Sequence, residues 1–552
     1  MRRQALPLTH SLNLPVPMKR LSKFIIDGFR LALALVLLNS ALTFQNRWPT
    51  AGVHWVPELS LDLLVLLLAL VMVCRRMPER WMQNLLLGGV MLLALGRYVD
   101  VTAPALLGRS VHLYWDSRHL PAVAAMLVDS VAGWQLALGS LALLVLLGIL
   151  TVVLRWALQT VLAALDQPRQ RRGLGLLAMG LLTLYGAGRW SERLPAERAF
   201  ALPVMPVFVQ QIQWALEAMV FRHQGWMAAA PPLPVLNRSD RKPGDVFVIF
   251  FESYGALVFD DARFARPLAG EFAALEQTLE SAGWRMASAR VKSSTFGGQS
   301  WLAHSSFLSG LRIANQGDYR DLLISDRRTL AHRFAEAGYR TVAVMPGLRY
   351  PWPEGQFYGF TEIYNAERLD YHGPAYGWWT IPDQYSLYRI HRTELAQTDR
   401  PPIFLFFPTI NSHAPFAPLP PYQPNWDTMN IAAGEGTAVA EVKLAERLDG
   451  AVLATAYRES VQYNLAVLGG YLRDYAPSNA LLLVIGDHQP PAIVGGREIS
   501  WEVPVHVFSR DPALLERFIA AGFQPGMVPG TASVGGLEQM GLLLIQQIPL
   551  GN

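Results

Sequence analysis

The run Val-Phe-Val-Ile-Phe-Phe at residues 246–251 is followed directly by Glu-Ser-Tyr-Gly at residues 252–255. An apolar run without a polar interruption, ended by a turn that contains glycine, indicates a strand buried on both faces of a sheet. Further β-rich runs follow along the chain at Thr341–Met345, Ile403–Pro408, Ala480–Ile485 and Val503–Phe508. Helical patterns lie between the runs, at Leu268–Ala282, Arg327–Ala337 and Glu459–Tyr471. This alternation predicts an α/β domain with a mostly parallel central sheet.

Polar side chains come directly after three of these predicted strands. They are Glu252, the Asn411-Ser412-His413 segment and the Gly486-Asp487-His488 segment. In open parallel sheets ligands bind beyond the carboxyl ends of the strands. Carboxylate oxygens together with an imidazole suit one divalent cation, Mn²⁺, Mg²⁺ or Zn²⁺. We therefore predict a shared metal site, the alternative being that each polar group caps its own turn.

A segment rich in hydroxyl groups, Ser-Ser-Thr-Phe-Gly-Gly-Gln-Ser-Trp, occupies residues 293–301. The paired glycines before Ser300 and the helix-like run after it place a hydroxyl at a helix N-terminus, where backbone N–H groups favour an anion. Beside a metal ion such a hydroxyl can ionise and act as a nucleophile. An ordinary helix cap formed by Ser300 is the alternative.

Composition separates the two halves of the 552-residue chain. Hydrophobic residues make up 51% and charged residues 16%, and the lone cysteine excludes a disulfide scaffold, a cysteine zinc cluster and an iron–sulfur protein. Residues 1–240 hold 22 Lys and Arg against 12 Asp and Glu, whereas residues 241–552 hold 25 against 31. An acidic C-terminal half argues against nucleic-acid binding, which requires a basic face.

The apolar N-terminal half predicts a transmembrane domain at 1–188 with five spans, near residues 25–44, 59–74, 82–96, 134–154 and 173–188. Twelve basic residues flank the spans on one side and four, including Arg97, flank them on the other. This asymmetry predicts a cytoplasmic N-terminus and an exported domain at 241–552. Residues 189–240 are interpreted as a connector with a helix at the bilayer surface, Pro203–Phe221, and a linker. Tyr114 and Trp115 of the exported loop are interpreted as interfacial anchors.

Taken together, these motifs resemble the alkaline phosphatase/sulfatase superfamily, and within it the membrane-bound lipoteichoic acid synthase and phosphoglycerol transferase branch. The shared order is five spans, a strand that ends in Glu-Ser, a Gly-Gly-hydroxyl segment, Ser-His-Ala-Pro-Phe at 412–416 and then Gly-Asp-His. Ser309-Gly310 lies at the distance from Ser300 that the family keeps from its nucleophile, which selects Ser300 over Thr295. The fold implied is a five-helix transmembrane domain followed by an alkaline-phosphatase-like α/β domain.

The resemblance also implies roles for single residues. Glu252, Ser300, Asp487 and His488 would bind one divalent metal ion, and Ser300 would be the nucleophile. His413 would contact the transferred phosphate and exchange the proton of the leaving group, so it counts as both catalytic and substrate-binding. Weaker likenesses place Trp352, His304 and Asp383 near the substrate. No other cofactor is implied. Leu302 and His304 stand where sulfatases need Pro and Arg to convert the nucleophile to formylglycine, which argues against sulfatase activity.

The function implied is a metal-dependent phosphotransferase of a bacterial inner membrane. It would move a phosphoglycerol or phosphoethanolamine head group from a membrane phospholipid to an extracytoplasmic glycan or lipid, through a phospho-Ser intermediate. Envelope polysaccharide machinery is a further expected partner. The alternatives are a membrane-bound phosphodiesterase that transfers to water, and a non-catalytic membrane scaffold for envelope glycan assembly.

Overall fold

The computed structural model describes residues 16–48, 50–74, 76–190, 199–220, 230–236, 244–349, 352–376, 381–397, 399–430, 449–496 and 499–548. The chain forms two compact units. The first comprises the described parts of Met1–Asn46, Val53–Val101 and Gly133–Gln210. The second comprises the described parts of Arg47–Gly52, Thr102–Ala132 and Gln211–Asn552.

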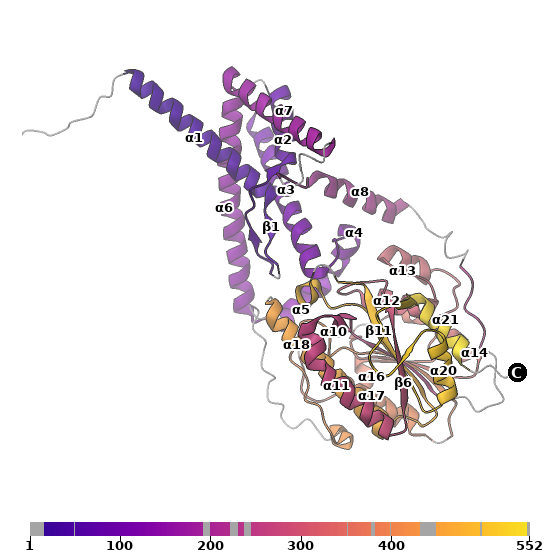
Figure 1. The fold of residues 1–552 in the computed structure, drawn as a ribbon. Helices are drawn as coiled ribbons and strands as arrows, with labels where there is room; N and C mark the ends of the chain where they lie inside the picture. Colours follow the sequence, from indigo (N-terminus) through magenta and orange to yellow (C-terminus); the bar gives the residue numbers. More distant parts are fainter. Residues whose placement is uncertain are drawn as a thin grey trace, which may run out of the picture. The chain divides into compact units, whose positions relative to one another are not determined.

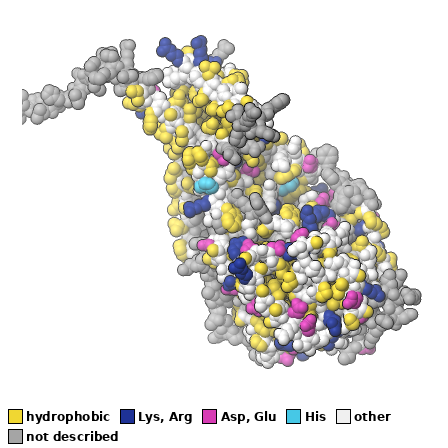
Figure 2. Space-filling view, in the orientation of Figure 1, with side chains coloured by type: hydrophobic (Ala, Val, Ile, Leu, Met, Phe, Trp, Pro, Cys, Tyr) yellow, Lys and Arg dark blue, Asp and Glu magenta, His cyan; other side chains and the backbone are white. Residues whose placement is uncertain are grey.

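The first unit is built from long apolar helices (Figure 1). They are α1 (Val16–Thr43), α2 (Leu61–Val73), α3 (Arg80–Leu107), α6 (Gly133–Leu165) and α7 (Pro168–Trp190). Helix α1 packs against α6, and α2 packs against α7. Two short strands, β3 (Leu59–Ser60) and β4 (Phe200–Ala201), pair in parallel within this unit. Hydrophobic side chains cover much of its surface, whereas charged side chains are scattered over the second unit (Figure 2).

Three helices among the described residues are long and apolar enough to cross a membrane: Ile25–Thr43, Arg80–Leu107 and Gly133–Leu165. They coincide with three of the five predicted spans. The predicted second span is the 13-residue helix α2, about 20 Å long at 1.5 Å per residue and shorter than a bilayer core. The predicted fifth span is α7, whose first turns carry Arg169, Arg171 and Arg172. Crossing by α2 and α7 stays a prediction.

Arg97 is placed differently from the sequence interpretation. It lies within α3 and not in a loop, and only 2% of it is exposed. Its Nε donates a hydrogen bond to the Phe44 carbonyl oxygen at 3.0 Å and its Nη1 donates to that of Leu202 at 3.4 Å. A buried guanidinium is tolerated because carbonyl oxygens accept its protons. Arg97 therefore does not belong to the loop charges that indicate topology.

The second unit contains one nine-stranded sheet among its described residues. Its strands are β5 (Val246–Phe251), β6 (Arg285–Lys292), β7 (Arg340–Met345), β8 (Glu362–Asn365), β9 (Ile403–Pro408), β10 (Leu481–Gly486), β11 (Glu502–Ser509), β12 (Gln524–Pro525) and β13 (Ser533–Gly536). The order across the sheet is β12-β6-β11-β10-β5-β9-β7-β8, and β13 pairs with β6. The five predicted strands are thus confirmed, with ends that shift by at most one residue.

The sheet is mixed, although most of it is parallel. Strands β10, β5, β9, β7 and β8 pair in parallel, whereas β11 runs antiparallel to both β10 and β6. The expectation of a parallel arrangement is therefore wrong for β11. Strands β6 and β8 were not predicted, because β6 carries Ser288 and Arg290 instead of an apolar run.

Alternate side chains of the central strands enter two separate cores. Phe247, Ile249 and Phe251 face one core, which is covered by α11 (Ala262–Ser281) and α18 (Gly450–Asp474). Val248 and Phe250 face the other core, which is covered by α12 (Ser300–Ser309), α14 (Leu330–Glu336), α20 (Pro512–Ala520) and α21 (Leu537–Gln547). Figure 1 shows α11 and α20 on opposite sides of the strands. Burial on both faces explains why these strands are apolar throughout.

His506 on β11 is fully buried and held in one neutral form. The Ser288 hydroxyl donates a hydrogen bond to the Gly526 carbonyl at 2.6 Å, so it accepts one from His506 Nδ1 at 2.7 Å. His506 Nε2 then accepts from the Tyr254 hydroxyl at 2.9 Å. Burial lowers the pKa of His506 to about 3, because the charged ring would lose its hydration.

We expect this histidine to make the fold sensitive to acid. Between pH 6.5 and about 3 the unfolded chain binds the proton and the folded chain does not, so the free energy of unfolding falls as the pH falls. The slope is about 1.4 kcal/mol per pH unit. In His506→Gln the midpoint of denaturation should depend less on pH between pH 6.5 and 4.5. His372→Gln changes a side chain that is 80% exposed and should leave this pH dependence as it is in the unmodified chain. Equal slopes in both variants would contradict the prediction.

Candidate active site

The carboxyl ends of β5, β9 and β10 lie next to each other at one edge of the sheet. Phe251 of β5 pairs with Gly486 of β10, so the residues that follow them, Glu252 and Asp487, emerge side by side. Gly486 is required here because a Cβ atom would collide with the carbonyl oxygen of Tyr254. The parallel register therefore brings together two carboxylates that lie 235 positions apart in the chain.

Glu252, Asp487 and His488 form one buried cluster. Each offers a ligand atom, and these atoms all lie within 4.8 Å of one another. His488 Nε2 lies 3.3 Å from Glu252 Oε1 and 3.8 Å from Asp487 Oδ2. His488 Nδ1 donates to the Gln489 carbonyl oxygen at 2.8 Å, which turns Nε2 toward the carboxylates.

Ser300 reaches this cluster from the first turn of α12. Its hydroxyl donates to Glu252 Oε2 at 2.8 Å and lies 3.1 Å from His488 Nε2. The preceding Gly297 and Gly298 have φ angles of +65° and +142°, which only glycine adopts readily. At Gly297 a Cβ atom would also collide with the Leu107 carbonyl oxygen. The two glycines thus let the chain turn sharply into the helix that carries Ser300.

The other hydroxyl groups of the segment are engaged elsewhere. The Thr295 hydroxyl donates to the Gly298 carbonyl at 2.6 Å, and the Ser293 hydroxyl donates to the Asp487 carbonyl at 2.5 Å. Ser294 accepts a hydrogen bond from Ser306. These bonds shape the loop, and within the segment it is Ser300 whose hydroxyl contacts both Glu252 and His488.

The pKa values of the three titratable groups in the cluster shift in different directions. Burial opposes ionisation of Glu252, but the hydrogen bond and charge of His488 lower its pKa. Burial and the neighbouring charge of Glu252 raise the pKa of Asp487. Burial opposes protonation of His488, yet the charges of Asp487 and Glu252 raise its pKa to about 9. Two buried carboxylates require a compensating positive charge, which a proton on His488 supplies in part.

The donor set fits a divalent metal ion. Asp487 Oδ1 accepts hydrogen bonds from the backbone N–H groups of Ser253 and His488, at 2.8 and 2.7 Å. Asp487 Oδ2 is buried and receives no hydrogen bond from any described residue. A buried carboxylate oxygen without a donor requires another partner. Two carboxylates, one imidazole and the Ser300 hydroxyl form the mixed oxygen and nitrogen set that Mn²⁺ or Zn²⁺ accepts.

His304 lies one turn after Ser300 on α12 and faces the same cluster. Its Nε2 is 3.9 Å from Asp487 Oδ2, and no described residue forms a hydrogen bond with this nitrogen. Its ring lies between those of Phe250 and Phe406, and burial lowers its pKa to about 4. His304 is therefore a neutral imidazole beside the predicted metal ligands, and its contact with substrate stays a prediction.

His413 lies on the loop after β9, half-buried, and close enough to Glu252 for its charge to lower the pKa of that carboxyl. Its Nδ1 donates to the Ala414 carbonyl at 2.7 Å. Asp383 at the start of α17 (Asp383–Ile390) holds this loop, because its carboxylate accepts hydrogen bonds from the backbone N–H groups of Ile410 and Asn411. Asp383 is completely buried, which raises its pKa to about 7.

Asp383 is thus seen supporting the loop of His413, and its expected contact with substrate stays a prediction. Trp352 stacks on Tyr358 with ring centroids 5.5 Å apart, and the Tyr358 hydroxyl bonds Ser305 of α12 at 2.7 Å. Among the described residues, Trp352 forms no hydrogen bond with Glu252 or Ser300.

The structure adds partners for the nucleophile segment that sequence reasoning missed. Trp115 on α4 (Leu113–Asp116) is only 5% exposed, so its interpretation as an interfacial anchor is wrong. Asp116 accepts two hydrogen bonds from Arg109 at 2.9 and 3.1 Å and one from Gln299 at 3.4 Å. The loop of residues 109–119 thus belongs to the wall of the site. The charged and aromatic residues gathered in this loop were the sequence feature that could have indicated this role.

Comparison with known proteins agrees with this geometry. Residues 283–504 match the sulfatase family model, and this stretch includes Ser300, His413, Asp487 and His488. The resemblance to the alkaline phosphatase/sulfatase superfamily is therefore confirmed for this part of the chain. No curated protein matches the sequence.

Several solved structures are similar. The lipooligosaccharide phosphoethanolamine transferase EptA of Neisseria meningitidis, an integral membrane protein, is 12% identical over 89% of both chains, with a TM-score of 0.48. The phosphoglycerol transferase GacH of Streptococcus pyogenes, in complex with sn-glycerol-1-phosphate, is 11% identical over 57% of this chain and 89% of its own, with a TM-score of 0.36. The periplasmic domain of EcEptC of Escherichia coli, in complex with zinc, is 14% identical over 50% of this chain and 76% of its own, with a TM-score of 0.34.

Proposed function

We propose that the protein is a metal-dependent phosphotransferase that moves a phosphoglycerol or phosphoethanolamine head group from a membrane phospholipid to an extracytoplasmic glycan or lipid. The observation that carries the proposal is the Ser300 hydroxyl. It stands at the first turn of a ten-residue helix and donates a hydrogen bond to a buried carboxylate, Glu252, within a cluster suited to a divalent cation.

A divalent cation held by Glu252, Asp487, His488 and Ser300 would stabilise the ionised serine and neutralise charge on the phosphate. Zinc bound to the EcEptC domain and the resemblance of the motifs make Zn²⁺ or Mn²⁺ the ions to test first. The metal role assigned to each of these residues is part of the proposal.

In the first step Ser300 Oγ attacks the phosphorus atom of the donor lipid. Glu252 is positioned to receive the hydroxyl proton, because the hydrogen bond between them already exists at 2.8 Å and the lowered pKa keeps this carboxylate ionised. The backbone N–H groups at the start of α12 would donate hydrogen bonds to the non-bridging phosphate oxygens. The new O–P bond replaces the bond to diacylglycerol, whose departing oxygen takes a proton from His413.

In the second step an acceptor hydroxyl attacks the phospho-Ser300 diester. His413 takes the proton of that hydroxyl, the P–Oγ bond breaks, and Ser300 Oγ recovers from Glu252 the proton that it gave up in the first step. The hydrogen bond from His413 Nδ1 to the Ala414 carbonyl would fix the tautomer, so that Nε2 is the ring atom that exchanges the proton. Asp383 would keep the loop in place for both steps.

The membrane part of the proposal rests on the helical unit. Three described helices are long and apolar enough to span a bilayer, and helix α8 (Met205–Val220) exposes Val209, Ile212 and Leu216 along one side. An apolar helix face of this kind suits the bilayer surface. We propose a bacterial inner-membrane protein with five spans, a cytoplasmic N-terminus and an exported catalytic unit, so that a phospholipid can reach Ser300.

The proposal predicts a covalent intermediate that identifies the head group. The purified full chain, loaded with Mn²⁺ or Zn²⁺, is incubated with phosphatidylethanolamine or with phosphatidylglycerol and no acceptor. Mass spectrometry should find the head group of one lipid on the peptide that contains Ser300. An adduct on Thr295 would contradict the assignment of the nucleophile, and release of head groups without any trapped adduct would contradict the two-step mechanism.

A further inference from the structure

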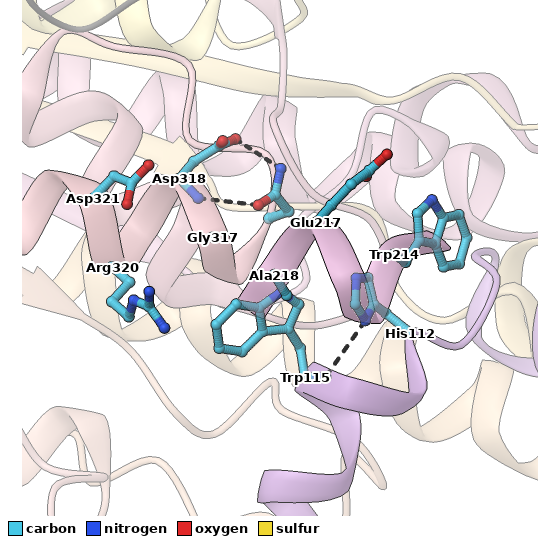
Figure 3. A pocket seen from close by; sticks show the side chains of 10 residues that line it. His112, Trp115, Trp214, Glu217, Ala218, Gly317, Asp318, Arg320 and Asp321 are labelled. Atoms are coloured by element: carbon cyan, nitrogen blue, oxygen red, sulfur yellow. Dashed lines mark hydrogen bonds between the residues drawn. The ribbon is translucent and has the colours of Figure 1, made fainter. Parts of the chain in front are cut away.

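A pocket of about 350 Å³ lies within the second unit, outside the cluster of Glu252, Asp487 and His488. Three segments line it (Figure 3). The turn at α4 supplies His112 and Trp115, and α8 supplies Trp214, Glu217 and Ala218. The third segment, α13 (Gln316–Leu323) with the residue before it, supplies Asn315, Gly317, Asp318, Arg320 and Asp321.

Asp321 is the residue that marks this pocket as a binding site. It is only 7% exposed, yet no described residue donates a hydrogen bond to its carboxylate or forms an ion pair with it. Its neighbour Arg320 instead lies over the Trp115 ring, 5.7 Å from the centroid. A buried carboxylate that lines a cavity without a protein donor takes its hydrogen bonds from water or from a ligand that enters the cavity.

The pocket offers hydrogen-bond donors as well as acceptors. Glu217, Asp318 and Asp321 carry acceptor oxygens. The Arg320 guanidinium is a donor, and the indole N–H groups of Trp115 and Trp214 bond no acceptor among the described residues. A ligand whose polar groups both donate and accept therefore matches the lining best. Hydroxyl groups have this property.

Two other ligand classes fit less well. A phosphate group only accepts hydrogen bonds when ionised and would meet three carboxylates against one guanidinium. An ammonium group only donates and would leave the indole N–H groups unused. The ring faces that would attract a cation are also covered: His112 stacks on Trp214 at 5.1 Å and 12°, and Arg118 lies 4.7 Å from the Trp115 centroid.

Hydrogen bonds connect two of the segments that line the pocket to the residues on either side of Ser300. Gln299, which precedes Ser300, donates to Asp116 at the end of α4 at 3.4 Å. Trp301, which follows Ser300, donates from its indole nitrogen to Gln316 at the start of α13 at 3.1 Å. Two of the three segments that line the pocket are therefore hydrogen-bonded to the immediate neighbours of Ser300.

We propose that this pocket binds a sugar ring of the acceptor, with Asp321 recognising its hydroxyl groups. The inference rests on the proposed function and specifies it, because it commits the acceptor to a carbohydrate. A pocket of this volume accommodates a single sugar ring with its bound water. The acceptor hydroxyl would thus be presented next to the phospho-Ser300 diester.

The test measures binding without any donor lipid. The metal-loaded full chain, in a detergent without a sugar head group, is mixed with the methyl glycosides of glucose, galactose, mannose and N-acetylglucosamine, and separately with ethanolamine and inorganic phosphate. Saturation-transfer NMR should show contact with at least one glycoside. Asp321→Asn removes a charged acceptor and keeps the size of the side chain. It should raise the dissociation constant about tenfold, the effect of losing one hydrogen bond to a charged or buried group.

Asp399→Asn, at an exposed site away from the pocket, is the matched control and should bind as the unmodified chain does. Bound metal should be retained in Asp321→Asn, which shows that the site has folded. Absence of contact with all four glycosides, a dissociation constant in Asp321→Asn equal to that of the unmodified chain, or binding of ethanolamine or phosphate alone would overturn the proposal. Failure to release a head group from either phospholipid would instead overturn the proposed function, and the binding result would still stand.

Discussion

Replacement of Ser300 by alanine is expected to lower the rate of head-group transfer by a factor on the order of 10⁴ or more, because no other hydroxyl of its segment contacts Glu252 and His488. The residual rate would come from phosphate positioning alone. The assay follows release of diacylglycerol from a labelled phospholipid by the full chain. Metal content should persist, since Glu252, Asp487 and His488 remain within 4.8 Å of one another in this fold.

The matched control is Thr295→Val. Thr295 lies in the same segment, but its hydroxyl donates to the Gly298 carbonyl, so its loss should loosen the loop and lower the rate far less than Ser300→Ala does. If Ser300→Ala kept full activity, the nucleophile would be wrong. If Thr295→Val were the inactive variant, Thr295 and not Ser300 would be the nucleophile.

Replacement of Asp487 by asparagine is expected to weaken metal binding by more than about a hundredfold, since even removal of a residue that only supports a ligand costs 10–100-fold. Asparagine keeps an oxygen for the two backbone N–H groups that Asp487 Oδ1 now accepts. It replaces Oδ2, the oxygen without a donor, by an amide NH₂ that cannot bind a cation. The fold should therefore survive while the metal is lost.

The measurement is a titration of the chelator-treated full chain with Mn²⁺ and Zn²⁺, read as bound metal per chain. Asp399→Asn should bind the metal as the unmodified chain does. If Asp487→Asn bound the metal with unchanged affinity, Oδ2 would not be a ligand. The carboxylate would then serve only to accept the backbone hydrogen bonds of Ser253 and His488. In that event Glu252 and His488 would have to be tested as metal ligands that act without Asp487.

The central strands could be read from the sequence because each is buried on both faces. Val246–Phe251 and Ile403–Pro408 are apolar at every position, and the structure places them as β5 and β9 with the same ends. Strand β6 could not be found in this way. Its Ser288 and Arg290 are buried because distant residues pair with them, His506 with the first and Asp260 with the second.

The candidate site, too, could be predicted from the sequence only in part. The strand-end positions of Glu252 and Asp487 follow from the sequence, because parallel strands carry their carboxyl ends to one edge. The antiparallel direction of β11 does not, since an apolar run has the same composition in either direction. The expectation for Trp115 failed for a related reason, because an aromatic residue near a membrane span and one packed into a soluble unit are identical in sequence.

The sequence by itself determined the buried strands, the polar groups at their ends and the apolar helices, because each depends on residues within one short segment. Tertiary structure alone showed that the Ser300 hydroxyl, which the family resemblance selects over that of Thr295, donates to Glu252. It also decided that α4, α8 and α13 enclose a pocket around the unpaired Asp321. These features depend on contacts between segments separated by 48 residues or more, and the pattern within any one of the segments carries no record of its partners.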